Sequence, residues 1–335
     1  MDLSTLVKMS NTYGSNPAYV LAGGGNTSVK NDTTLYVKGS GTQLATIKAE
    51  GFVKMDRARL NEIMKTEYPK NDVEREAAYL ADVMAAVTDD DKTKRPSVEA
   101  LLHNLFAYTY VLHVHPTLVN GLTCGKGAQA LCEELLGEAV LWIDICKPGY
   151  TLARLCFEKM NAYKEKYGKD VQVLLLQNHG IFVAANTVEE IGVLFDSVIS
   201  KLEKQVKRTA DVSDAVTPEK EQAAQKLSQL LGHAVEVVPV AEADNFAKDK
   251  TAAAPLLKPF TPDHIVYCGP YPLFVENIDQ AKEALDAFMT ENDKEPRLIL
   301  VQGIGAFIME DDKEKAAKAQ LLVKAFLQSG NGNPA

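Results

Sequence analysis

The stretch Tyr110-Val111-Leu112-His113-Val114-His115-Pro116 decides how this 335-residue chain folds. In a β-strand successive side chains alternate between faces, so Val111, His113 and His115 share one face. At a rise of ~3.4 Å per residue the two histidines lie about 7 Å apart along the strand and can converge on one metal ion. Proline cannot continue a strand ladder, so Pro116 places this pair at a strand end. The alternative is a pair of core or solvent-facing histidines, and a third ligand would decide between the two.

A candidate third ligand follows another apolar run. Residues 171–176 are apolar enough for a strand that is buried on both faces. Gln177-Asn178-His179-Gly180 comes next, and residues 181–184 are apolar again. A tight turn between two such strands places His179 at the tip of a hairpin. A site with three histidines keeps coordination positions open for water or substrate, as in catalytic zinc centres.

Two glycine-rich segments precede these strands. Gly23-Gly24-Gly25-Asn26-Thr27-Ser28 and Lys38-Gly39-Ser40-Gly41-Thr42 combine glycines with short polar side chains. Glycine lets backbone amides approach a ligand closely, so the two loops could hold one anion between them. Neither is a nucleotide-binding P-loop, because no Gly-Lys-Ser/Thr follows at the required spacing. The alternative is that both are ordinary flexible turns.

The segment Pro96-Ser97-Val98-Glu99 introduces a candidate acid/base residue. We expect a helix over about residues 95–108, with Ser97 as its N-cap and Glu99 in its first turn, where the helix dipole favours an anion. This structural role would explain Glu99 fully, and catalysis is the alternative. His103 lies one turn later on the same side, and we expect it to be packed rather than liganding.

Composition bounds the class of protein. Hydrophobic residues make up 46% and charged residues 24% of the chain, which is ordinary for a globular protein. The net charge of -9 argues against nucleic acid or an anionic membrane as partner. We see no signal peptide and no apolar run long enough to span a membrane. Five cysteines without a Cys-x-x-Cys pair favour reduced thiols, so we expect a cytoplasmic protein.

The length favours two domains. We expect a first α/β domain over residues 1–208, a helical connection over 209–260 and a small α/β domain over 261–335. In the last of these we expect strands near residues 265–268, 273–275 and 298–301. Gly303-x-Gly305 follows the third of these strands, but Ile308 stands where a dinucleotide-binding fingerprint needs its third glycine.

A second hairpin is expected near the C-terminus. When residues 174–187 are aligned with 299–312, Gln177 meets Gln302, Gly180 meets Gly305 and Phe182 meets Phe307. His179 meets Ile304, so the second hairpin would lack the metal ligand. Chance similarity of two apolar strand–turn–strand segments is the alternative.

Over residues 1 to about 208 the chain resembles the class II aldolase/adducin family. Five motifs occur in the family's order: Gly-Gly-Asn26-Thr-Ser, Lys38-Gly-Ser40-Gly41, Pro96-Ser97-Val98-Glu99, His113-Val-His115-Pro and Gln-Asn-His179-Gly. The resemblance implies an α/β/α layered domain with a central, mainly antiparallel sheet. It also implies a zinc ion, or another divalent metal, on His113, His115 and His179, with Glu99 as the acid/base residue. Asn26, Ser40, Gly41 and Ser97 would line the site for a substrate phosphate.

The implied activity is that of an aldehyde-lyase acting on a small sugar phosphate in a homo-oligomer. Residues 261–305 resemble the stretch after the aldolase domain in long rhamnulose-1-phosphate aldolase/lactaldehyde dehydrogenase proteins, whose dehydrogenase domain we do not find here. Members acting on fuculose phosphate have a second serine where this chain has Val98. The expected reaction is therefore cleavage of a deoxyketose 1-phosphate, similar to rhamnulose 1-phosphate, to dihydroxyacetone phosphate and lactaldehyde. Alternatives are a pentulose-phosphate 4-epimerase with the same metal site, a dehydratase of the family, and a non-catalytic adducin-like scaffold.

Overall fold

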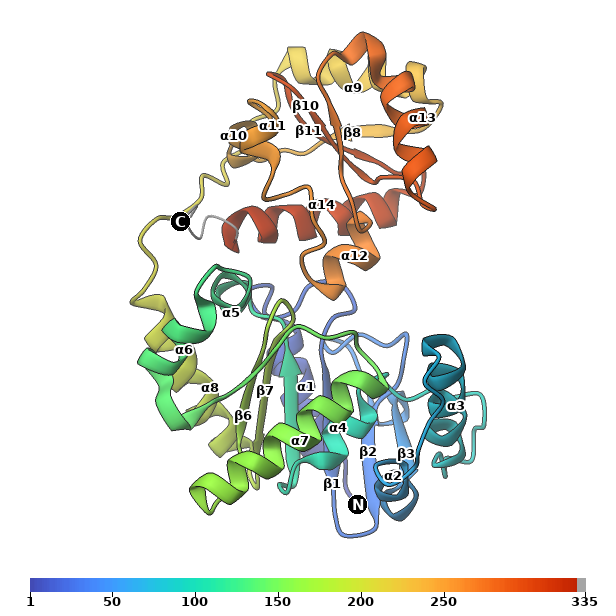
Figure 1. Cartoon of the computed structure of the whole chain (residues 1–335), viewed down its shortest axis with the longest axis vertical. Coiled ribbons are helices and arrows are strands. Elements are labelled where there is room, and N and C mark those ends of the chain that lie inside the picture. Colours follow the sequence, from blue (N-terminus) through green and yellow to red (C-terminus); the bar gives the residue numbers. More distant parts are fainter. Residues whose placement is uncertain (330–335) are drawn as a thin grey trace. The chain divides into compact units, whose positions relative to one another are not determined.

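The computed structural model describes residues 1–329, which form two compact units (Figure 1). The first unit contains Met1–Thr123 and Gly127–Gln205, and the second contains Cys124–Lys126 and the chain from Val206 onward. Residues 330–335, the end of the domain expected over 261–335, lie outside the described residues. Among residues 1–329, no helix has both the length and the apolar character that a membrane crossing needs.

The first unit is built on a seven-stranded sheet. Its strand order is β3-β2-β1-β4-β7-β6-β5. Every neighbouring pair is antiparallel except β5 and β6, which confirms the mainly antiparallel sheet. The strands are β1 (Asn26–Lys30), β2 (Thr34–Lys38), β3 (Phe52–Asp56), β4 (Tyr110–Val114), β5 (Leu141–Ile143), β6 (Val173–Leu176) and β7 (Gly180–Ala185).

Helices cover both faces of this sheet, which confirms the α/β/α layering. In Figure 1, α4 and α7 cross in front of the sheet and α1 lies behind it. One face packs on α2 (Arg57–Ile63), α3 (Asp72–Ala85), α4 (Ala100–Leu105) and α7 (Tyr150–Tyr167). The other packs on α1 (Ser4–Gly14), α5 (Thr117–Thr123), α6 (Ala128–Leu136) and α8 (Val188–Glu203). Short 3₁₀ turns occupy Ala49–Gly51 and Gly137–Ala139.

The alternation expected for β4 is confirmed. Val111 belongs to the apolar cluster under α4 and α7, whereas Leu112 and Val114 belong to the cluster on the opposite face. His113 therefore points to the α4 side, and its ring stacks on Phe182 with the ring centroids 3.9 Å apart. The sheet thus places the His113 ring at one strand end, next to the apolar cluster under α4 and α7.

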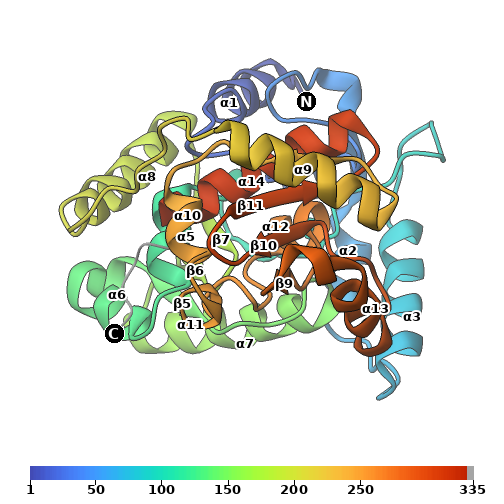
Figure 2. The same ribbon diagram turned by 90° about the horizontal axis from the view of Figure 1, so that it is seen from above.

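The second unit has a four-stranded sheet with the order β8-β11-β10-β9. Figure 2 shows β9, β10 and β11 next to one another. Helices α9 and α13 cover one face of this sheet in an apolar cluster. The elements are α9 (Pro218–Leu231), β8 (Val235–Val237), α10 (Glu242–Phe246), α11 (Lys250–Ala253), α12 (Pro262–Cys268), β9 (Leu273–Val275), a 3₁₀ turn (Ile278–Gln280), α13 (Ala281–Glu291), β10 (Leu298–Val301), β11 (Gly305–Met309) and α14 (Lys313–Ser329).

Two expectations for this part of the chain need correction. Residues 209–260 are not a separate connection, because α9 packs on α13 and β8 pairs with β11 inside the second unit. Residues 265–268 are not a strand but part of α12. The Thr261 side chain accepts a hydrogen bond from the His264 backbone N–H, and Pro262 occupies the first helical turn, so capping outweighs the apolar run that suggested a strand.

The expected second hairpin is confirmed, and its register matches the first. Val301 pairs with Gly305 in β10–β11 as Leu176 pairs with Gly180 in β6–β7. Each hairpin also has a parallel neighbour on its first strand, β9 or β5. A helix precedes each hairpin and another follows it, so β9-α13-β10-β11-α14 repeats β5-α7-β6-β7-α8.

The turns of the two hairpins also correspond in detail. The Gln177 backbone N–H donates to the Ile143 carbonyl at 2.9 Å, and the Gln302 N–H donates to the Val275 carbonyl at 2.8 Å. Matching backbone bonds at this level favour a true repeat over chance similarity. Gly303 lies in a hairpin turn between antiparallel strands, whereas a dinucleotide fingerprint needs a strand that leads directly into a helix.

Candidate metal centre

Three histidines from two chain segments meet at one end of the first sheet. His113 is in β4, His115 follows its end, and His179 lies in the turn between β6 and β7. Because Val114 pairs with Ile181 in the β4–β7 ladder, that turn is held beside the end of β4. One ring nitrogen from each histidine lies within 4.8 Å of the others.

The ring of His113 is fixed in a ligand-competent orientation. Its Nδ1 lies 3.0 Å from the Ile181 carbonyl oxygen. A carbonyl only accepts, so Nδ1 carries the hydrogen and Nε2 presents its lone pair. The Nε2 atoms of His113 and His115 are 2.9 Å apart. This approach of two imidazole nitrogens fits a shared cation.

The Glu99 carboxylate completes the cluster. Its Oε2 lies 3.3 Å from His113 Nε2, and its Oε1 lies 3.2 Å from His179 Nε2. The Glu99 side chain is only 6% exposed, and Oε1 has no hydrogen-bond partner among residues 1–329. A buried carboxylate oxygen without a donor is costly unless a cation satisfies it. The donor set of three imidazoles and a carboxylate therefore fits a divalent metal ion.

The position of Glu99 corrects the expected helix over residues 95–108. Helix α4 begins only at Ala100, so Ser97 does not cap it and Glu99 precedes its first turn. The preceding residues are extended because they pair with the loop after β2. Gly39 forms a β-bridge with Pro96, and the Ser97 N–H donates to the Lys38 carbonyl at 2.9 Å. This pairing holds Glu99 against the histidines.

Asn26 and Ser97 lie beside the same carboxylate. Asn26 opens β1 directly opposite His113 in the β1–β4 ladder. Its Nδ2 donates to Glu99 Oε2 at 2.8 Å and to Ser97 Oγ at 3.0 Å. Both residues are buried, so they are part of the site's wall.

Ser40 and Gly41 lie in the loop after β2. The Ser40 N–H donates to the Arg95 carbonyl at 2.8 Å, which holds this loop beside the segment that contains Ser97. Both residues are exposed, and Gly41 has a φ of +84° with open space where a side chain would be. Their role in holding a phosphate stays a prediction.

Two glycines let the backbone close around the histidine strand. A Cβ on Gly180 would lie 2.6 Å from the Val114 carbonyl oxygen and 2.7 Å from Cδ2 of His115. A Cβ on Gly25, whose φ is +70°, would lie 2.7 Å from the His113 carbonyl oxygen. The sequence signal for Gly180 was its position directly after a hairpin histidine.

One contact beside the site could not be foreseen from the amino-acid pattern. His103 is fully buried, as expected, but its ring is bonded at both nitrogens: Nδ1 to Ser28 Oγ at 2.7 Å and Nε2 to Asn26 Oδ1. Burial lowers the pKa of His103 well below its ordinary value, so the ring is neutral. No local pattern relates residue 28 to residue 103.

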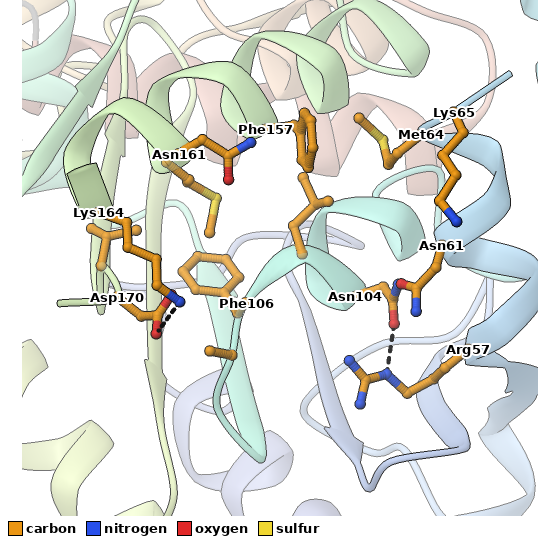
Figure 3. Close-up of a pocket in the computed structure, with 14 residues that line it drawn as sticks. Arg57, Asn61, Met64, Lys65, Asn104, Phe106, Phe157, Asn161, Lys164 and Asp170 are labelled. Carbon is orange, nitrogen blue, oxygen red and sulfur yellow. Dashed lines mark hydrogen bonds and ion pairs between the residues drawn. The ribbon is translucent and has the colours of Figure 1, made fainter. Parts of the chain in front are cut away.

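A cavity of about 370 Å³ in the first unit is separate from this cluster (Figure 3). Arg57, Lys65 and Lys164 line it together with apolar side chains that include Phe106 and Phe157. Figure 3 shows Arg57 bonded to Asn104 and Lys164 paired with Asp170. None of the three histidines or Glu99 lines this cavity.

Comparison with known proteins finds similar solved structures. A solved structure titled the N-terminal class II aldolase domain of a conserved protein from Thermoplasma acidophilum is 26% identical, with a TM-score of 0.52, covering 62% of this chain and 94% of that one. A structure titled L-fuculose 1-phosphate aldolase is 17% identical, with a TM-score of 0.40, covering 61% of this chain and 86% of that one.

A curated Bacillus subtilis (strain 168) protein named "Uncharacterized oxidoreductase YuxG" is 24% identical over 90% of this chain, which spans only 50% of that protein's length. The model of the Class II Aldolase and Adducin N-terminal domain matches residues 5–199, more than half of the chain. The chain therefore belongs to the class II aldolase and adducin family.

Proposed function

We propose that this chain is a zinc-dependent aldolase that cleaves a deoxyketose 1-phosphate, similar to rhamnulose 1-phosphate, to dihydroxyacetone phosphate and lactaldehyde. Family membership supports an aldolase-type lyase that uses a divalent metal. The observation that carries the proposal is the buried Glu99 carboxylate, 3.2–3.3 Å from the Nε2 atoms of two of the three clustered histidines.

His113, His115 and His179 would hold the metal ion. When bound, such an ion polarises the carbonyl and hydroxyl oxygens of a ketose and stabilises negative charge that develops on them. The hydrogen bond from His113 Nδ1 to the Ile181 carbonyl fixes the orientation of the His113 ring, so that its Nε2 would face the metal ion.

Glu99 would move the proton in the cleavage step. The bond between C3 and C4 of the sugar breaks, the C4 hydroxyl loses its proton and becomes the aldehyde, and C3 takes up a proton. Glu99 in its acid form would donate that proton to C3, and in the synthetic direction its carboxylate would remove it. The proton from the C4 hydroxyl goes to a second base, which we do not assign.

The substrate phosphate would lie against Asn26, Ser40, Gly41 and Ser97. Ser97 Oγ already accepts hydrogen bonds from Asn26 Nδ2 at 3.0 Å and from the Glu99 N–H at 3.3 Å, so its own hydrogen can be donated to an anion. Val98, which is 63% exposed, offers no hydroxyl at the position of the second serine of fuculose-phosphate aldolases. The preference for rhamnulose 1-phosphate rests on the resemblance of residues 261–305 to the stretch after the aldolase domain in long rhamnulose-1-phosphate aldolase proteins.

We further propose that the protein is a cytoplasmic homo-oligomer whose partner is a small sugar phosphate. Buried free thiols at Cys132, Cys156 and Cys268 fit a reducing compartment. We do not extend to this chain the oxidoreductase activity in the name of the Bacillus subtilis protein, of which the chain spans half.

The test is release of dihydroxyacetone phosphate by the zinc-loaded full chain. The protein is incubated with L-rhamnulose 1-phosphate, L-fuculose 1-phosphate and L-ribulose 5-phosphate, and dihydroxyacetone phosphate is reduced enzymatically with NADH. We expect NADH oxidation with a deoxyketose 1-phosphate, fastest with rhamnulose 1-phosphate. An epimerase would convert the pentulose phosphate without NADH oxidation, and a scaffold would convert none. Full activity in metal-free protein would also refute the proposal.

A further inference from the structure

One face of β1 is polar and yet buried against α4 and the residue before it. Asn26, Ser28 and Lys30 alternate with Thr27 and Val29, so all three project to the same side of the sheet. Their exposures are 6%, 0% and 4%. Lys30 Nζ donates to the His103 carbonyl at 2.8 Å, which fixes the backbone of α4. The other two side chains reach the His103 ring and Glu99.

The hydrogen positions in this face follow from the chemistry of the partners. A carboxylate only accepts, so the atom of Asn26 that lies 2.8 Å from Glu99 Oε2 must be the amide nitrogen. Asn26 Oδ1 consequently faces His103 Nε2, which must donate. The neutral His103 ring then accepts at Nδ1 from the Ser28 hydroxyl, 2.7 Å away. One arrangement of protons satisfies every bond.

We propose that His103 is a positioning residue for the acid/base carboxylate. Ser28 orients the His103 ring, the ring orients the Asn26 carboxamide, and the carboxamide holds Oε2 of Glu99. This inference rests on the proposed role of Glu99. In this arrangement Asn26 donates both hydrogens of its amide, to Glu99 and to Ser97.

The hydrogen bond from His103 prevents the Asn26 carboxamide from rotating. Without it, the Asn26 carboxamide can rotate by half a turn and bring Oδ1 against Oε2 of Glu99. Two acceptors in contact repel, so the carboxylate would leave its place between His113 and His179. A misplacement of about 1 Å at a reacting group can reduce a rate about 100-fold. Both ring nitrogens of His103 are bonded to Ser28 and Asn26, neither of which is a proposed ligand, so metal binding should persist.

The first test is the H103F variant of the full chain. We expect kcat to fall about 10- to 100-fold while KM changes less than about twofold and the zinc content stays at the wild-type value. H103Q, which keeps an N–H donor, should recover part of kcat. The matched control is H264F: His264 is also bonded at both ring nitrogens, to Thr261 and to the Leu322 carbonyl, but in the second unit. A kcat loss of equal size in H264F, or wild-type kcat in folded H103F, would overturn the proposal.

A smaller substitution tests the same network even if H103F does not fold. S28A removes only the hydroxyl that fixes the ring, and we expect a smaller drop in kcat, again without a change in KM. The control is S10A, because Ser10 is equally buried and bonds to the Leu6 carbonyl and Thr27 away from the site. S10A should keep the wild-type kcat. A kcat of S28A no lower than that of S10A would contradict the network.

The second test needs no substrate. Long-range ¹H–¹⁵N spectra of histidine-labelled protein report which ring nitrogen carries the hydrogen. We expect His103, assigned by its loss in H103F or H103Q, to be neutral with hydrogen on Nε2, and we expect this tautomer to lose its dominance in N26A. Hydrogen on Nδ1 in the wild type would overturn the network. If no sugar phosphate is cleaved, the proposed function fails, while this measurement still decides whether the network exists.

Discussion

The Glu99 carboxylate oxygen Oε1 lies 3.2 Å from Nε2 of His179, and it has no hydrogen-bond partner among residues 1–329. The two residues come from unrelated segments, one before α4 and one in the β6–β7 turn. A buried acceptor beside converging imidazoles needs a cation nearby to offset its desolvation. This relationship joins the proposed metal ligands to the proposed acid/base residue in one site.

Replacing Glu99 by Gln tests whether Glu99 transfers the proton while the three histidines hold the metal. We expect E99Q to bind zinc as the wild type does, since the three histidines remain, but to lose about 10²- to 10⁴-fold in kcat because an amide cannot transfer the proton. Steady-state kinetics and metal analysis of the same sample measure both effects. The control is E62Q, which changes an exposed glutamate paired with Lys65. Unchanged turnover in E99Q would exclude Glu99 as the acid/base residue.

Removing His179 should abolish tight metal binding. We expect H179A to retain less than one zinc per chain after dialysis, because two imidazoles bind zinc more weakly than three. Zinc at 100 times its Kd stabilises a protein that binds it only when folded by about 2.7 kcal/mol, so Tm of the wild type should rise with zinc. Tm of H179A should not.

The control for this variant is H233A in the second unit, where His233 pairs with Asp311 at 3.0 Å. H233A should keep both the zinc content and the Tm response. Equal zinc stoichiometry in H179A and H233A would place the metal elsewhere.

Gly180 should tolerate no side chain. G180A introduces a Cβ at 2.6 Å from the Val114 carbonyl oxygen and 2.7 Å from the His115 ring, so the β4 end must shift. We expect lower zinc affinity and a loss of stability of about 1–3 kcal/mol, the usual cost of overpacking. The control is G192A in α8, where only the Tyr13 hydroxyl lies within 4 Å, at 3.8 Å. Alanine favours a helix by about 1 kcal/mol over glycine, so G192A should be neutral or stabilising. Similar zinc titrations for both variants would contradict the steric argument.

The second unit should lose stability in mild acid through His264. Burial of its ring lowers the pKa of His264 to about 4, whereas the ordinary value is 6.5. Between these values the unfolded chain binds a proton that the folded chain does not, so the free energy of unfolding falls as the pH drops from 6.5 towards 4. The slope from this residue is at most about 1.4 kcal/mol per pH unit.

Urea unfolding of the wild type and H264F at pH 7 and pH 5 isolates this contribution. The wild type should lose more stability between the two pH values than H264F does. Equal losses would show that His264 titrates normally in the folded protein.

The local pattern of apolar and turn residues was sufficient to predict several features of the fold. The alternation in β4 and the two hairpins follow from short-range periodicity and turn residues, and the structure confirms them. The layered α/β architecture was implied by the family resemblance, and the structure confirms it as well. The prediction over residues 95–108 was wrong where a distant strand intervened: pairing with Lys38 and Gly39 keeps Pro96–Ser97 extended, against a capping signal. For residues 265–268 the error was local, because Thr261 and Pro262 initiate a helix that the apolar run concealed.

The sequence by itself identified the candidate residues for the chemistry: a His-x-His pair at a strand end, a histidine in a hairpin turn and a glutamate in an expected first helical turn. The tertiary structure alone decided that Glu99 lies against His113 and His179, and that His103 and Ser28 hold Asn26 in place. The physical reason is the difference in sequence separation between local and tertiary interactions. Backbone geometry sets faces and turns over a few residues, whereas these hydrogen bonds join β1, α4 and the β6–β7 turn, which sheet pairing and helix packing bring together only in the folded chain.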